Sequence, residues 1–340
     1  MYIDICGLFG LSQMSFYHPV NGPLWPTIMA LDLALSDQVV FKTDIDACKK
    51  ASADFAHFSR GMLNHCVCAV DGKNISDLIV RVQLIHLYCS CVRLHLLTLL
   101  LLRLVLYLGL VIRTRCPTPR EMHAYAAPDL SAFINRKGFY GVVVLAACNA
   151  NLEFVFFSAK HTGSTNDVVA IQGCEGGRIL LGTSSTKLPL SYYGVGDEAF
   201  ICTDTLLTPW SGRGLDRNKD SFNFLLSAMR QCIERAFGMF VARWGIFRPP
   251  LTVGAQRWGL LLGVCAKLHN YCIRHGEGKP LSALQIDMQE GDEETVLDNQ
   301  QNYGATNKAG GVGSPLRRDI TTAIGEWGQI RPTSNCRRNS

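Results

Sequence analysis

Gly138–Asn149 (GFYGVVVLAACN) and Glu153–Lys160 (EFVFFSAK) are two apolar runs separated by three residues, with Asn151 at the centre. The first run is rich in β-branched residues, and each has the length of a buried strand. Because asparagine favours turns, the pair predicts a buried β-hairpin. We take this hairpin as the centre of the predicted sheet.

Three shorter apolar runs predict further strands. His65–Val70 ends at Asp71-Gly72, a dipeptide typical of turns, so we expect a core strand that stops there. Tyr193–Cys202 is a second candidate, and Thr205–Thr208, which is followed by Pro209, is a third.

The apolar pattern changes to a helical period after Ser221. Apolar side chains then recur at steps of three and four residues: Phe222, Leu225, Leu226, Met229, Ile233, Phe237 and Phe240. This spacing predicts one amphipathic helix of about five turns, and Trp258–Ile273 predicts another apolar helix. Strands that alternate with helices indicate an α/β domain with a mixed sheet flanked by helices.

Composition places the chain among globular proteins. Its 340 residues are 48% hydrophobic and 18% charged, which excludes collagen, a pure coiled coil and a wholly disordered chain. The net charge of +5 arises within residues 77–120, which hold six arginines and one aspartate. The 14 cysteines form no regular framework, and Cys66-x-Cys68 and Cys89-x-Cys91 lack zinc-motif spacing, so we expect reduced, mostly buried thiols. The first ten residues do not resemble a secretory signal.

The segment Leu94–Ile112 (LHLLTLLLLRLVLYLGLVI) is long enough to span a bilayer. Arg103 near its centre opposes insertion by roughly 2.5–3.5 kcal/mol. Three interpretations remain open: a membrane anchor, a helix that is buried or binds a partner, and sequence that does not belong to the folded domain.

Four carboxylates lie at the ends of predicted elements or among apolar residues: Asp71, Asp167, Asp197 and Glu234. A carboxylate in such surroundings is costly unless it is hydrogen-bonded, protonated or bound to a cation. If several of them converge, a divalent metal would offset their repulsion.

Three of these residues also have simpler interpretations. Asp71 could form a turn with Gly72, Ser164-x-x-Asp167 matches a capping box, and Glu234 could pair with Arg230 on a solvated helix face. Asp197 is harder to explain, because we expect it inside the strand Gly194–Phe200, where aspartate is depleted.

A series of short motifs occurs in one order along the chain: Asp71-Gly72, Arg115-Cys-Pro-Thr-Pro119, Asn135-Arg-Lys-Gly138, Gly163-Ser-Thr-Asn-Asp167, Gly196-Asp197, Leu207-Thr-Pro209, Ile233-Glu-Arg-Ala-Phe237 and Leu268-His-Asn270. Over Asn64–Ile273, apart from the Leu-rich segment, this series resembles the Harbinger/PIF-type transposase-derived nucleases of the DDE superfamily. A series in order is more specific than any single motif.

The resemblance implies an RNase H-like domain that cuts or joins DNA phosphodiester bonds with Mg²⁺ or Mn²⁺. It assigns Asp71, Asp197 and Glu234 as the catalytic, metal-binding triad and Asp167 as a further metal ligand. It also implies DNA as a partner, a separate DNA-binding accessory protein and a nuclear location. A catalytically inactive relic that binds DNA or protein is the alternative.

Two metal ions can activate a water and stabilise the leaving oxygen, and Mg²⁺ prefers oxygen ligands. The basic residues that could contact phosphates, or else belong to the solvated surface, are Arg136, Lys137, Arg230 and Arg235. We expect His161 and His269 to be structural, because the metal would activate the water.

The predicted organisation begins with a partial N-terminal helical region, residues 1–60. A nuclease domain follows in two pieces, 61–76 and 111–275, separated by a Leu-rich insertion at 77–110. Residues 276–340 form a flexible tail. Leu8–Tyr17 resembles the helix-turn-helix region of the family, but little precedes it. The tail is rich in Gly, Asn and Gln, which indicates mobility.

The distance between Asp71-Gly72 and the Arg-Cys-Pro motif departs from the family, in which the two are close. Gly72-Lys73-Asn74 could be encoded by GGU-AAG-AAU, which contains the start of a spliceosomal intron. We therefore hypothesise that about Lys73–Leu110 is a translated intron. Sequencing of the mature transcript should find messages that lack this block, whereas its presence in every spliced message would contradict the hypothesis.

Overall fold

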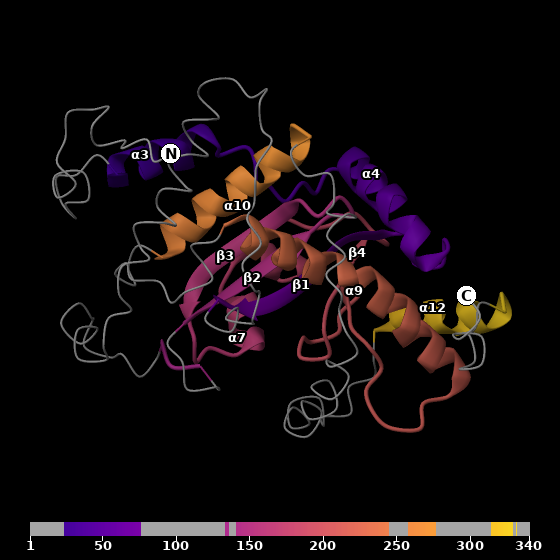
Figure 1. Ribbon diagram of the computed structural model, residues 1–340. Coiled ribbons are helices and arrows are strands. Elements are labelled where there is room, and N and C mark those ends of the chain that lie inside the picture. The colour runs from indigo at the N-terminus through magenta and orange to yellow at the C-terminus, as the bar shows by residue number, and fades with distance from the viewer. Residues whose placement is uncertain are drawn as a thin grey trace.

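The computed structural model describes residues 24–75, 133–135, 141–244, 258–276, 314–328 and 331. Within these ranges the chain forms a five-stranded sheet with helices on both faces (Figure 1). The Leu-rich segment Leu94–Ile112, nearly all of the proposed intron and the helix-turn-helix-like stretch Leu8–Tyr17 lie outside the described residues.

The sheet has the order β3-β2-β1-β4-β5. Its strands are β1 (Cys66–Asn74), β2 (Val142–Cys148), β3 (Phe154–Thr162), β4 (Tyr193–Val195) and β5 (Leu206–Leu207). The first three are antiparallel neighbours, whereas β4 runs parallel to β1 and β5 runs parallel to β4. This mixed arrangement confirms the predicted α/β class and is consistent with an RNase H-like fold.

The predicted hairpin is present as β2 and β3. Asn149 shapes its turn: its Oδ1 accepts the backbone N–H groups of Asn151 and Glu153, each at 3.0 Å. Its Nδ2 also donates to Glu153 Oε2 at 2.7 Å, and Leu152 takes a left-handed conformation with φ of 67°. A side chain that bonds to the backbone two residues on is the physical reason why asparagine favours turns.

Two predicted strand ends are wrong. β1 does not stop at Asp71-Gly72 but continues to Asn74, because β2 pairs with it through Asp71↔Ala146 and Asn74↔Val143. β4 ends at Val195, so Asp197 lies two residues beyond the strand and not inside it. The apolar residues after Asp197 belong to the loop that leads to β5.

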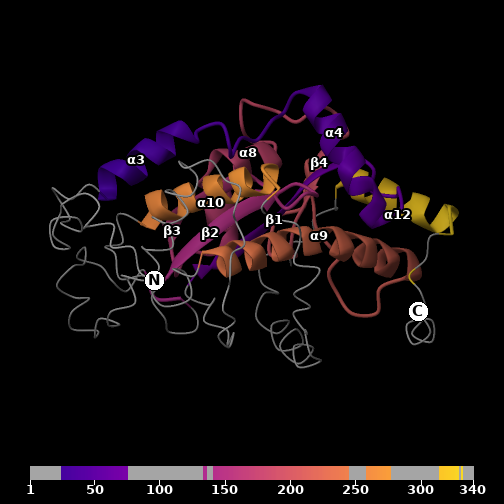
Figure 2. The ribbon, with the colours of Figure 1, turned by 45° about the horizontal axis from the view of Figure 1, so that its top comes forward.

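Helices cover both faces of the sheet (Figure 2). The two predicted C-terminal helices are confirmed as α9 (Arg217–Arg243) and α10 (Trp258–Arg274). They share one buried cluster with Ala69 and Val195, whereas Val70 packs in a second cluster on the other face. The remaining helices are α3 (Leu24–Ala34), α4 (Ile45–Ala56), α7 (Asp167–Gln172), α8 (Glu175–Leu180) and α12 (Pro315–Glu326).

The N-terminal helices belong to the same structural unit as the sheet. α3 packs against α10, and Lys267 Nζ forms an ion pair with Asp32 Oδ1 at 2.7 Å. α4 packs against β1 and contributes Cys48 and Phe55 to the two buried clusters. The described part of the predicted region 1–60 is therefore helical and packs against the sheet and α10.

The prediction of a flexible tail does not hold for α12, which packs along α9 (Figure 1). Arg317 is buried with its guanidinium 3.9 Å from the centre of the Trp210 ring, and its Nη1 donates to the carbonyl of Pro209 at 3.0 Å. Trp210 Nε1 donates to Thr321 Oγ1 at 2.9 Å. Leu316, Ile320 and Ile324 are spaced four residues apart, so they share one face of α12 and pack against the core.

The cysteines of the described ranges are free thiols, and all except the half-buried Cys202 are buried. This agrees with the expectation of reduced cysteines. Among the described helices, none has the combination of length and apolar character that a bilayer crossing needs.

Asn270 joins α10 to the sheet. Its Oδ1 accepts the N–H of Phe154 at 2.8 Å, and its Nδ2 donates to the carbonyls of Phe154 and Gln38, each at 2.7 Å. The side chain is fully buried, so it satisfies the backbone of β3 where water cannot. The Leu268-His-Asn270 motif therefore has a structural role.

Replacement of Asn270 by alanine should lower the free energy of unfolding by about 2–4 kcal/mol, because buried backbone groups of Phe154 lose their partner. Urea denaturation followed by circular dichroism measures this change. Asn151→Ala, in the exposed part of the β2–β3 turn, is the control and should change stability by less than about 0.5 kcal/mol. Equal effects of the two substitutions would contradict the structural role.

Candidate active site

The parallel pairing of β1 with β4 brings two of the predicted acids together. Cys68 pairs with Gly194 and Ala69 pairs with Val195, so two residues further along each chain the same register places Asp71 beside Asp197. Side chains alternate along a strand, and Ala69 packs in the α9-side cluster, so Asp71 also faces α9. The short strand β4 thus places Asp197, two residues after its end, beside Asp71 in the long strand β1.

α9 supplies a positive charge to this pair. Arg230 Nη1 lies 3.2 Å from Asp197 Oδ1, and the Arg230 side chain is 16% exposed, against 43% for that of Asp197. Its positive charge also favours the ionised form of Asp71. A single guanidinium therefore interacts with both carboxylates.

Asp71 is the most perturbed acid of the site. Burial raises its pKa to about 7, and the negative charges of Asp197 and Asp167 act in the same direction. Arg230 and the N–H of Gly72, which donates to Asp71 Oδ1 at 2.9 Å, oppose this rise. The positive charge of Arg230 thus only partly offsets burial and the neighbouring acids.

Asp167 reaches the same place from the other side of β1. It is the first residue of α7, whose N-cap is Asn166: Asn166 Oδ1 accepts the N–H of Val169 at 2.8 Å. The capping-box interpretation with Ser164 as the cap is therefore wrong. A Cβ at position 72 would lie 2.3 Å from Asp167 Oδ1, so any larger residue would displace this carboxylate. Gly72 thus lets Asp167 approach β1 and lies in a strand, not in a turn.

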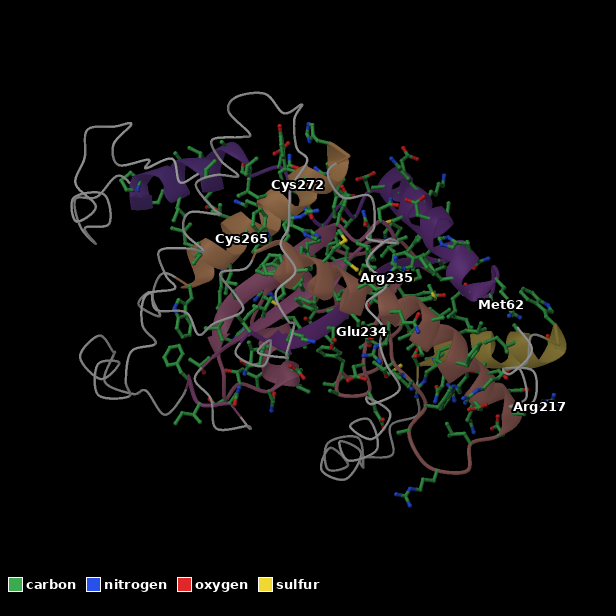
Figure 3. All side chains as sticks on the ribbon, in the orientation of Figure 1. Met62, Arg217, Glu234, Arg235, Cys265 and Cys272 are labelled. Carbon is green, nitrogen blue, oxygen red and sulfur yellow. The ribbon has the colours of Figure 1, made fainter. Side chains whose placement is uncertain are left out.

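Glu234 is placed differently from the three aspartates. It is exposed on α9, one turn after Arg230, in the part of the helix that crosses the sheet (Figure 3). Residues four apart share a helix face, yet Arg230 pairs with Asp197 and not with Glu234.

The site fits a divalent cation in its donor chemistry but not in a complete ligand set. Carboxylate oxygens are the ligands that Mg²⁺ and Mn²⁺ prefer, and a cation beside Asp71 would stabilise the ionised carboxylate that burial and the neighbouring acids disfavour. Among the described residues, however, His, Cys, Asp and Glu side chains do not form a group of three or more that could hold a metal. Asp71 and Asp197 are the two acids that the strand register brings together.

The two histidines named from the sequence pack as structural residues. His269 is fully buried between aromatic rings, and its Nε2 lies 3.1 Å from the carbonyl oxygen of Leu152. Burial, with the charge of Arg243, lowers its pKa to about 3, so the imidazole is neutral at physiological pH. The ring of His161 packs against Gly173, where a Cβ would lie 2.5 Å from it.

The contact of Arg230 with Asp197 was missed from the sequence. Arg230 was considered only as a phosphate contact or as the partner of Glu234. The sequence did offer a signal: Arg230 follows Met229, at the edge of the apolar stripe of α9. A charged residue at the edge of a buried helix face lies close to the element that the helix covers. The other basic candidates Arg136 and Lys137 lie outside the described residues.

The sheet order is consistent with the class of RNase H-like domains. Residues 111–270 match the model of the DDE superfamily endonuclease family, which confirms the resemblance stated from the motifs. A protein named ALP1-like from Arabidopsis thaliana is 26% identical over 159 residues, which cover 43% of this chain and 38% of that relative. The chain thus spans well under half of the length of this relative. No solved structure matches the chain.

Asp71→Asn should stabilise the metal-free protein at pH 8 and have less effect near pH 4.5. The carboxyl pKa is about 7 in the folded state and about 3.9 in the unfolded chain. Between these values the folded state holds a proton that the unfolded state has lost, so the contribution of Asp71 to stability falls as the pH rises. Melting temperatures in EDTA measure this dependence. The exposed Asp46→Asn is the control, and a shift for Asp71→Asn that does not vary with pH would contradict the burial of its charge.

Proposed function

We propose that this chain is a divalent-metal-dependent nuclease, a transposase or a protein derived from one, that cuts or joins DNA phosphodiester bonds. The observation that carries the proposal is the β1–β4 register, which sets Asp71 beside Asp197 in an RNase H-like sheet. The DDE superfamily match supports the same reaction class.

Asp71 and Asp197 would hold the cation. Each binds a backbone N–H through Oδ1: Gly72 donates to Asp71, and Glu198 donates to Asp197 at 2.7 Å. These bonds fix the two carboxylates and direct their charge to a shared space. A bound Mg²⁺ or Mn²⁺ would activate the attacking water and stabilise the leaving 3′-oxygen.

The remaining roles rest on the resemblance to the family. Glu234 is proposed as the third catalytic acid, and Asp167, whose carboxylate lies against Gly72, as a further ligand. DNA is the proposed substrate, with a separate DNA-binding accessory protein and a nuclear location. These assignments extend to this chain what the motifs imply for its relatives.

A catalytically inactive relic is the second candidate function. The exposed position of Glu234 and the Arg230–Asp197 ion pair favour it, because a complete acidic ligand set is not assembled among the described residues. Such a protein would keep the fold and bind DNA or a protein partner. Titration with Mn²⁺ separates the two candidates, since the relic should bind the ion poorly.

Purified protein with Mg²⁺ or Mn²⁺ should nick plasmid DNA, and Asp197→Asn should reduce the rate by more than about 100-fold, because it removes a charged metal ligand. Gel analysis of nicked product against time measures this rate. Asp46→Asn on the exposed first turn of α4 is the matched control. Circular dichroism must show that both variants are folded. Equal cleavage by Asp197→Asn and the control would refute the assignment.

A further inference from the structure

Arg230 is bound in an unusual way for a residue of a solvated helix face. It is largely buried, its Nη1 reaches Asp197, and its Nε is buried without a hydrogen-bond partner in the described part of the chain. A guanidinium usually satisfies its donors when it leaves water, because an unpaired buried donor is costly. What holds Arg230 in place is therefore the negative charge of the acids and not a complete set of hydrogen bonds.

The acids do not need Arg230 for their orientation. Asp71 and Asp197 each have one oxygen bonded to the backbone N–H of the next residue. The bond to Arg230 is made to the same Oδ1 of Asp197 that already accepts the N–H of Glu198, and it is the longer of the two, at 3.2 Å against 2.7 Å. Loss of Arg230 would leave Asp197 anchored but would remove the main positive charge described beside the pair.

We propose that Arg230 acts as an internal counter-cation, which stabilises the Asp71–Asp197 pair in the metal-free protein and competes with the divalent cation for it. This inference rests on the proposed function, because it assumes that the pair binds metal. A fixed positive charge within a few ångströms of a divalent ion repels it strongly at the dielectric of a partly buried site. Arg230 therefore sets how much divalent cation the site needs.

The first test is a double-substitution cycle on the metal-free protein. Arg230→Gln should lower the melting temperature, since two acids lose their counter-charge, whereas Arg230→Gln combined with Asp197→Asn should recover much of that loss. If Arg230→Gln does not fold, the double variant should fold. Additive effects, or a double variant that stays unfolded, would overturn the proposal.

The second test is the affinity for Mn²⁺, measured by electron paramagnetic resonance of the free ion without DNA. Arg230→Gln should bind Mn²⁺ about tenfold more tightly or better than the wild type, and Arg230→Lys, which keeps the charge, should stay close to the wild type. The control is Arg217→Gln, an exposed arginine at the other end of α9 (Figure 3), which should leave the affinity unchanged.

The outcomes distinguish this inference from the proposed function. Mn²⁺ binding that Asp197→Asn abolishes, but that Arg230→Gln leaves unchanged or weakens, would overturn only the role of Arg230. If Mn²⁺ binding that depends on Asp197 is absent from the wild type and from Arg230→Gln, both proposals fail.

Discussion

The burial of the Asp71 carboxylate beside Asp197 and Arg230 is the constraint around which the site is built. The two acids are 126 positions apart in the sequence, and the parallel register of β1 and β4 fixes them side by side. Ala69 and Val195, two residues before the acids, are fully buried between the sheet and α9. Apolar burial therefore stabilises the strand backbone that brings the two carboxylates together.

The elements around the pair each reduce part of this electrostatic cost. α9 packs ten buried residues against the core and at the edge of that stripe delivers Arg230 to Asp197. The backbone N–H groups of Gly72 and Glu198 bind one oxygen of each acid. Asp167 acts in the opposite direction, since its approach over Gly72 adds a further negative charge. At Asp71, burial and the neighbouring acids together outweigh Arg230 and the backbone N–H of Gly72, so the pKa of this carboxyl is raised.

The features that could be predicted from the sequence are those that depend on local patterns. The hairpin of β2 and β3 and the helices α9 and α10 follow from apolar periodicity, and nothing distant is needed to define them. The end of β1 could not be predicted in this way, because Gly72 lies in a strand only when β2 pairs with it. The helix α12 was missed for a related reason: Arg317 is a core residue only beside Trp210, which is more than a hundred positions earlier. Among the site residues, the pairing of Arg230 with Asp197 and not with Glu234 was decided by tertiary packing over the i, i+4 preference.

The pairing of β1 also bears on how the site tolerates the long stretch between Asp71 and the family match, which begins at residue 111. Asp71 lies inside the β1–β2 ladder, which continues for three more residues to Asn74 and Val143. The acid is therefore held in the ladder with β2 before the chain leaves the sheet, and β4 pairs with β1 up to Ala69, two residues earlier. Closing a longer connection between two strands costs only about 0.6 kcal/mol for each doubling of its length. The same chain-entropy argument applies whether the block of about Lys73–Leu110 is an insertion or a translated intron. The position of Asp71 is thus fixed by the pairing of β1 with β2. The length of the chain that follows β1 has only a small effect on stability by comparison.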